Sequence, residues 1–178
     1  MTEYSDLYTS WIVKGSHLNK ILNCGQKYNG WAEHALCCLP PDIFGKYRDR
    51  LYFIGTGDMD ACRVAPALSR DREIIVLSER IFPKKGAAED NPKVRYFIFV
   101  VLHEIAHVVK NHRSPLLDKL TKEENEAQEK EADDLAIDWF NAYIATRNSP
   151  YLKSITPDEI TEAKEINQKL MEKAYEES

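Results

Sequence analysis

The 178-residue chain lacks any stretch close to the roughly 18 consecutive apolar residues that a membrane-spanning helix requires. Its first residues, Met1 to Asp6, are polar and acidic, whereas a secretory signal peptide starts with basic residues and continues with an apolar run. Both absences argue against a membrane protein and against a secreted one. We therefore expect a cytoplasmic protein that does not bind a membrane.

An excess of positive charge is lacking too. The formal net charge is −5 and the pI is about 5.6, whereas domains that bind nucleic acid usually carry a basic surface. We expect no direct contact with nucleic acid. Hydrophobic residues at 43% and charged residues at 30% are typical of a globular protein, and the length suits one domain, which we expect over residues 1–178.

The cysteines lack the spacing of a disulfide framework or of a tetrahedral thiolate metal site. There is no Cys-x-x-Cys pair, and two of the four are adjacent: Cys24, Cys37, Cys38 and Cys62. We expect reduced thiols that are mostly buried.

Two strand patterns lie in the middle of the chain. Residues 51–54 form an aromatic and β-branched run that ends in turn residues, and residues 73–78 are apolar on both faces, which predicts a strand inside the sheet. A weaker strand is expected within residues 61–68, where Pro66 interrupts the pattern. By contrast, residues 1–40 have the periodicity of two or three short helices.

Helices follow the expected strands. Asn91 and Pro92 are a favourable N-cap and first helical residue, and the residues after them are apolar around nearly the whole circumference, which predicts a buried helix. Two later segments begin with capping boxes, in which Thr is followed three residues later by Glu. The expected helices run from about Pro92 to His112, from about Thr121 to Arg147 and over about residues 157–175.

The most specific motif is His103-Glu104-Ile105-Ala106-His107, on the buried helix. Four residues correspond to about 400° of helical rotation, so the two imidazoles lie on one face. Glu104 lies beside that face, within reach of a water on a metal ion held by the histidines. This is the HExxH arrangement of zinc hydrolases, which predicts His103 and His107 as metal ligands and Glu104 as the catalytic base.

A zinc hydrolase site has a third protein ligand, for which the next helix offers several acids. Its apolar residues define one arc: Ala132, Ala136, Trp139, Phe140 and Tyr143. Glu129 and Asp133 lie within this arc, where carboxylates are costly unless they are paired or bind a metal ion. Glu126 lies at the edge of the arc and is the weaker candidate.

His112 is not expected to be a ligand. The spacing of metzincins would place a third histidine at the position of Arg113. On a continuous helix, His112 would also lie about 180° from His103. We therefore interpret it as a residue of the helix C-terminus. Asn111, one turn beyond His107, could contact the site or cap the helix, and we favour the cap.

These residues together resemble a known family group. His103-Glu104-x-x-His107 followed by Glu129-x-x-x-Asp133 resembles the gluzincin pattern of the thermolysin type. The likeness is closest to the ImmA/IrrE peptidases, with some likeness to HtpX-type peptidases, and it covers about residues 70–145. It implies a compact, zincin-like α+β domain, in which a small mixed or antiparallel sheet packs on the buried HExxH helix and a following ligand helix.

The resemblance further implies that Glu129 is the third ligand of one zinc ion and that Asp133 hydrogen-bonds a ligand histidine. The implied activity is hydrolysis of a peptide bond in a partner protein, with a transcriptional repressor as the substrate that the ImmA/IrrE likeness indicates. Such substrates usually bind as an added strand, here expected beside a hairpin within residues 51–68. Donors to the oxyanion are sought after the ligand helix, at Tyr143, Arg147 or Tyr151.

A function of another class stays open, namely a non-catalytic, zincin-like binding or regulatory module. Glu104 argues mildly against it, because a purely structural metal site does not need that carboxylate.

Overall fold

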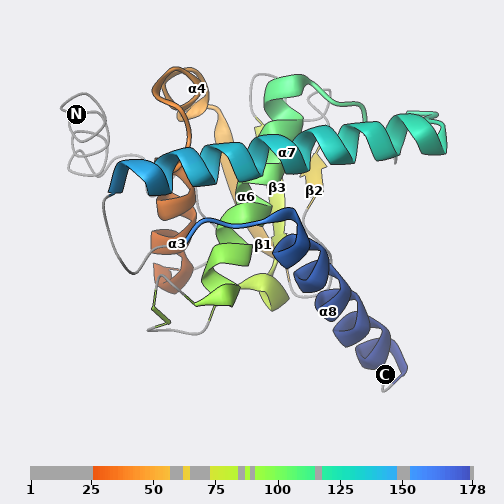
Figure 1. Ribbon diagram of the computed structural model, residues 1–178. Helices are drawn as coiled ribbons and strands as arrows, with labels where there is room; N and C mark the ends of the chain where they lie inside the picture. The colour runs from red at the N-terminus through yellow and green to blue at the C-terminus, as the bar shows by residue number, and fades with distance from the viewer. Residues whose placement is uncertain are drawn as a thin grey trace.

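The computed structural model describes residues 26–56, 62–64, 73–83, 87–88, 91–114, 118–147 and 153–176. Most of the helical segment expected within residues 1–40 lies outside these residues, as do Cys24 and Tyr151. The described chain is a compact α+β domain, which confirms the expected fold class (Figure 1). Within it, helix α6 lies between the long helix α7 and a small sheet (Figure 1).

Two helices precede the sheet. Helix α3 (Gln26–Cys37) lies within the segment expected to be helical, and it packs against α6. Helix α4 (Pro41–Tyr47) lies beyond the segment expected to be helical and is not predicted from the sequence. Pro41 occupies the start of α4, where the missing N–H costs nothing. At the end of α3, Cys37 and Cys38 are free thiols, and burial raises the pKa of Cys37 to about 11.

The sheet is mixed and has three described strands, β1 (Leu51–Thr56), β2 (Cys62–Val64) and β3 (Glu73–Ser78), in the order β1-β3-β2. Strand β3 pairs in parallel with β1 and antiparallel with β2. The expected central place of β3 is therefore confirmed. The hairpin expected within residues 51–68 is wrong, because the strand that is apolar on both faces lies between the two strands that follow each other in sequence.

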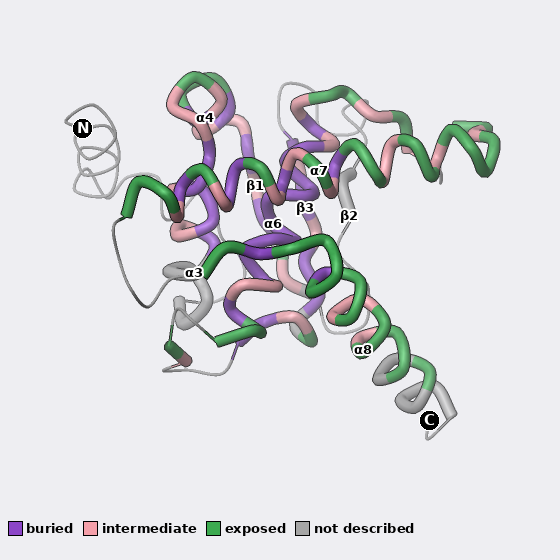
Figure 2. The backbone as a smooth tube through the Cα atoms, in the orientation of Figure 1, coloured by how far each residue is buried: buried purple, intermediate pink, exposed green. Residues whose placement is uncertain are grey.

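Helix α6 (Pro92–Lys110) carries the HExxH motif through the interior, and Figure 2 shows it buried along most of its length. The side chain of Asn91 accepts a hydrogen bond of 2.9 Å from the backbone of Lys93, which confirms the expected N-cap. The helix ends two residues before the expected His112. Asn111 adopts the left-handed conformation, with φ 54° and ψ 43°, which asparagine tolerates well.

The last two helices, α7 (Lys122–Arg147) and α8 (Pro157–Glu176), begin at the two expected capping boxes. In the first box, the backbone N–H of Glu124 donates to Thr121 Oγ1 at 3.1 Å, while Thr121 N–H donates to the carboxylate of Glu124 at 2.9 Å. Helix α7 crosses α6, and α8 points away from the body and is largely exposed (Figures 1 and 2). Among the described residues, no helix is long and apolar enough to cross a membrane.

Candidate metal centre

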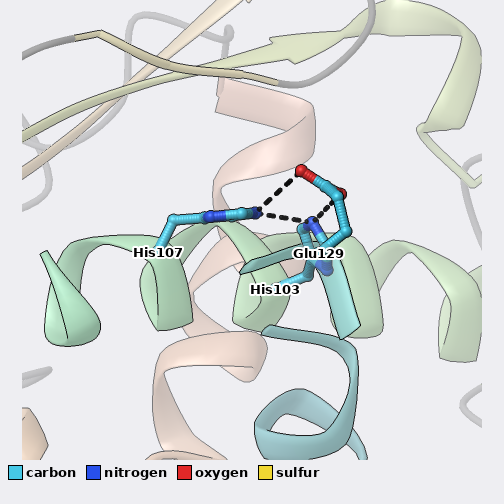
Figure 3. A group of neighbouring side chains, drawn as sticks. All are labelled: His103, His107 and Glu129. Atoms are coloured by element: carbon cyan, nitrogen blue, oxygen red, sulfur yellow. Dashed lines mark hydrogen bonds and ion pairs between the residues drawn. The ribbon is translucent and has the colours of Figure 1, made fainter. Parts of the chain in front are cut away.

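The two histidines of the motif lie on the face of α6 that α7 covers. His103 and His107 are one helical turn apart, and their Nε2 atoms approach each other to 3.0 Å. His103 is only 8% exposed. Figure 3 shows both rings directed toward the carboxylate of Glu129, which comes from α7.

Glu129 completes a group of three donors. Its Oε2 lies 3.3 Å from Nε2 of His103, and its Oε1 lies 3.6 Å from Nε2 of His107. Tetrahedral ligands about 2.0–2.1 Å from a zinc ion are separated from one another by about 3.3 Å. The separations of 3.0 to 3.6 Å therefore suit one ion at the common centre, and these three residues could hold a metal ion.

Asp133 contacts the outer ring nitrogen of His103. Its Oδ1 lies 2.8 Å from Nδ1 of that histidine, one helical turn beyond Glu129 on α7. Lys164 of α8 donates hydrogen bonds of 2.8 and 2.6 Å to the two oxygens of Asp133. No sequence pattern singles out Lys164, because it is one of many charged residues on α8 and only the packing of that helix brings it to α7.

The charges around His103 change its pKa. Burial lowers this pKa, but Asp133 and Glu129 outweigh burial, and the net result is a pKa of about 9. The pKa of Glu129 is lowered, because its contact with His103 favours the carboxylate form more than burial opposes it. A proton and a metal cation therefore compete for the same pocket of negative charge.

The outer ring nitrogen of His107 has a different neighbour, His112. The two Nδ1 atoms are 2.8 Å apart, and Nε2 of His112 lies 3.0 Å from Oε2 of Glu131 on α7. Lys110 Nζ in turn lies 2.5 Å from Oε1 of Glu131. The prediction that His112 points away from the motif is wrong, because it assumed a continuous helix and the helix ends before this residue.

The comparison with protein families concerns this same part of the chain. Residues 96–164 match the family model described as Peptidase U49. The match starts within α6, contains all of α7 and ends at Lys164, so it includes each of the residues of the centre named above. It supports peptidase activity in general. No curated protein and no solved structure matches the chain.

Two further acids that the sequence singles out, Glu104 and Glu126, differ in how far they are buried. Glu104 is buried, with 6% of its surface exposed, next to His103 on α6, and its charge also raises the pKa of His103. Glu126 is largely exposed and pairs with Lys122 at 3.5 Å, away from the three donors.

The structure does not bring the expected oxyanion donors Tyr143 and Arg147 to the centre. Tyr143 lies 14 residues after Glu129 on the same helix, which corresponds to about 21 Å. Its hydroxyl accepts a hydrogen bond from Arg147, and its ring packs edge-on against His34 of α3 at 5.8 Å. Tyr143 therefore contacts α3 and not the metal centre, and Arg147 is its hydrogen-bond partner.

Proposed function

We propose that this protein is a zinc-dependent endopeptidase of the gluzincin type, in which His103, His107 and Glu129 hold one zinc ion. The observation that carries the proposal is the convergence of their donor atoms, at 3.0 to 3.6 Å from one another, beside a buried glutamate. The family match over residues 96–164 agrees with peptide hydrolysis. A bound zinc ion supplies an acidified water and polarises the carbonyl of the scissile bond.

Glu104 is the proposed catalytic base. It accepts a proton from the attacking water and then donates it to the nitrogen of the leaving amine. Glu104 is buried and follows the ligand His103 directly on α6. A purely structural metal site would not need this carboxylate, which supports the catalytic role.

Asp133 is the proposed orienting acid. It lies 2.8 Å from Nδ1 of His103, where it would hold the proton on that nitrogen and leave Nε2 free to bind the metal. The role that the gluzincin resemblance implies for this residue therefore agrees with its position.

The proposed substrate is an extended segment of a partner protein. The outer strands of the described sheet, β1 and β2, are the candidates to pair with such a segment, since β3 is paired on both sides. By analogy, the resemblance to ImmA/IrrE peptidases points to a transcriptional repressor as the substrate and to the cytoplasm as the place of cleavage. Incubation with each candidate repressor of the same genome tests this substrate, and absence of cleavage in all of them would contradict it.

Zinc content and hydrolysis together test the activity. Purified wild-type protein should contain about one zinc ion per chain and should cleave labelled casein, an unfolded probe substrate. Glu104→Gln should keep the zinc and lose activity by about 100-fold or more, because a lost general base typically costs that much. Glu124→Gln is the matched control, since it keeps the capping box at an exposed position of α7.

Two results would contradict the proposal. If the Glu104 variant cleaves as well as the wild type, the assigned mechanism is wrong. If zinc-loaded wild-type protein cleaves neither casein nor any candidate repressor, the non-catalytic binding module takes its place.

A further inference from the structure

The segment that follows α6 turns back against the metal centre. Asn111 reverses the chain at the helix end, and the backbone N–H of His112 donates to the carbonyl oxygen of His107 at 3.0 Å. The side chain of His112 is only 7% exposed, whereas that of the next residue, Arg113, is 51% exposed. His112 therefore points inward from an otherwise exposed segment.

Hydrogen bonds hold this segment on α7. The backbone N–H of Arg113 donates to Oε1 of Gln128 at 2.8 Å, and Nε2 of Gln128 donates to the carbonyl oxygen of Arg113 at 3.2 Å. This pair fixes the segment next to the turn of α7 that carries Glu129 and Glu131. The backbone on both sides of His112 is thus held in place, by the helix cap before it and by the hydrogen bonds of Arg113 to α7 after it.

We propose that His112 is a positioning residue for the metal ligand His107 and that Glu131 holds His112 in that role. This inference rests on the proposed function, because it takes His107 as a ligand. It adds a second chain of contacts, Glu131 to His112 to His107, to the one that joins Asp133 to His103.

Metal binding by His107 would set the direction of each hydrogen bond. To bind a metal ion, Nε2 of His107 must carry no hydrogen, so the ring proton lies on Nδ1. Nδ1 of His112, 2.8 Å away, accepts that hydrogen bond. The proton of His112 then lies on Nε2, which donates to the carboxylate of Glu131 at 3.0 Å. In this series of contacts each ring nitrogen thus acts as a donor, an acceptor or a metal ligand without conflict. Lys110 balances the charge of Glu131.

Two substitutions of the histidine separate this role from simple packing. His112→Asn keeps a carbonyl oxygen near the place of Nδ1, and therefore an acceptor for His107, whereas His112→Leu fills similar space without an acceptor. Glu131→Gln weakens the acceptor for His112 at a position that is 47% exposed, where we expect only a small change in stability. Glu126→Gln removes one charge from the same helix, at an exposed pair with Lys122, and serves as the control.

Zinc affinity, measured by competition with a chelator, is the first readout. We expect His112→Leu to weaken zinc binding by roughly 10- to 100-fold, the usual effect of losing a partner of a ligand histidine. His112→Asn should recover most of this loss, Glu131→Gln should cost about threefold to tenfold, and the control should match the wild type. Thermal unfolding of the zinc-free variants checks that each is folded. If His112→Leu is not folded, the zinc affinity of Glu131→Gln tests the proposal in its place.

The second readout is the NMR spectrum of the ring nitrogens in zinc-loaded protein. His107 should show a slowly exchanging proton on Nδ1 in the wild type and in His112→Asn, and this proton should exchange faster in His112→Leu. If the Leu and Asn variants bind zinc as tightly as the wild type, or weaken equally, His112 does not position His107, although the proposed function stands. If the wild type binds no zinc, both proposals fail together.

Discussion

His103 and His107 lie one turn apart on the same helix face, yet their outer ring nitrogens have different partners. His103 contacts a carboxylate directly, that of Asp133, which is 27% exposed and is tied to Lys164. His107 contacts a second histidine, which in turn reaches a carboxylate, that of Glu131, 47% exposed. His103 reaches its carboxylate without an intervening residue, and that carboxylate is the less exposed of the two. We therefore expect Asp133 to orient His103 more firmly than Glu131, through His112, orients His107.

Loss of Glu129 should have the largest effect, because this donor serves both histidines. In Glu129→Ala, zinc content after dialysis should fall from about one ion per chain to below about a tenth, since two histidines alone rarely retain the ion. Glu126→Ala is the matched control, one turn nearer the helix start and paired only with Lys122 among the contacts described. A variant at position 129 that keeps its zinc would remove Glu129 from the ligand set.

Asp133→Asn tests the direct support of His103. The amide can donate to the ring and favour the tautomer with its proton on Nε2, which opposes metal binding. We expect zinc affinity to fall by about 10- to 100-fold, and by more than in Glu131→Gln. Asp134→Asn, which removes the same charge from an exposed pair with Lys130, should leave the affinity unchanged. If the Glu131 variant loses more affinity than the Asp133 variant, the expected order of the two sides is reversed.

The stability of the zinc-free protein should depend on pH through His103. Its pKa is about 9 in the folded protein against an ordinary value of 6.5, because Asp133 and Glu129 outweigh the effect of burial. Since the folded pKa is the higher one, this contribution is full below pH 6.5 and is lost as the pH rises through about 9.

We expect the free energy of unfolding to fall by on the order of 1–2 kcal/mol as His103 loses its proton. The value is modest because solvent weakens the contacts of His103 with the partly exposed Asp133 and Glu129. Urea unfolding in the presence of a chelator measures it. The same titration of Asp133→Asn should be flatter, and an equal slope in both proteins would mean that another group is responsible.

Lys164→Met should have the smallest effect. The ion pair of Lys164 with Asp133 is partly solvated, and such pairs contribute up to about 1 kcal/mol, or about fivefold in zinc affinity. Lys130→Met, at the exposed pair with Asp134, is the control and should have no effect. A loss as large as that in Asp133→Asn would show that Asp133 depends on Lys164 for its position.

Local patterns in the sequence predicted most of this domain. The capping boxes at Thr121 and Thr156 and the central strand β3 each depend on residues a few positions apart along one element, where periodicity and spacing decide the outcome. The three converging donors come from two such elements, the histidines from α6 and Glu129 from α7. Glu129 and Asp133 could be selected because carboxylates on an apolar arc need partners.

Features that depend on where elements end or meet could not be predicted in the same way. His112 was placed wrongly because two residues of helix length decide whether it points away from His107 or back toward it. Asn111 is a usable signal for the end of the helix, because asparagine tolerates the left-handed conformation that ends many helices. Lys164 offered no signal, since only the docking of α8 selects it among the charged residues of that helix.

The central claim is that one zinc ion lies between His103, His107 and Glu129, and anomalous X-ray diffraction at the zinc edge tests it most directly. We predict a single strong peak about 2.0–2.2 Å from Nε2 of each histidine and from a carboxylate oxygen of Glu129. A crystal of zinc-loaded protein with no peak at this position, or with the ion bound by other residues, would contradict the claim.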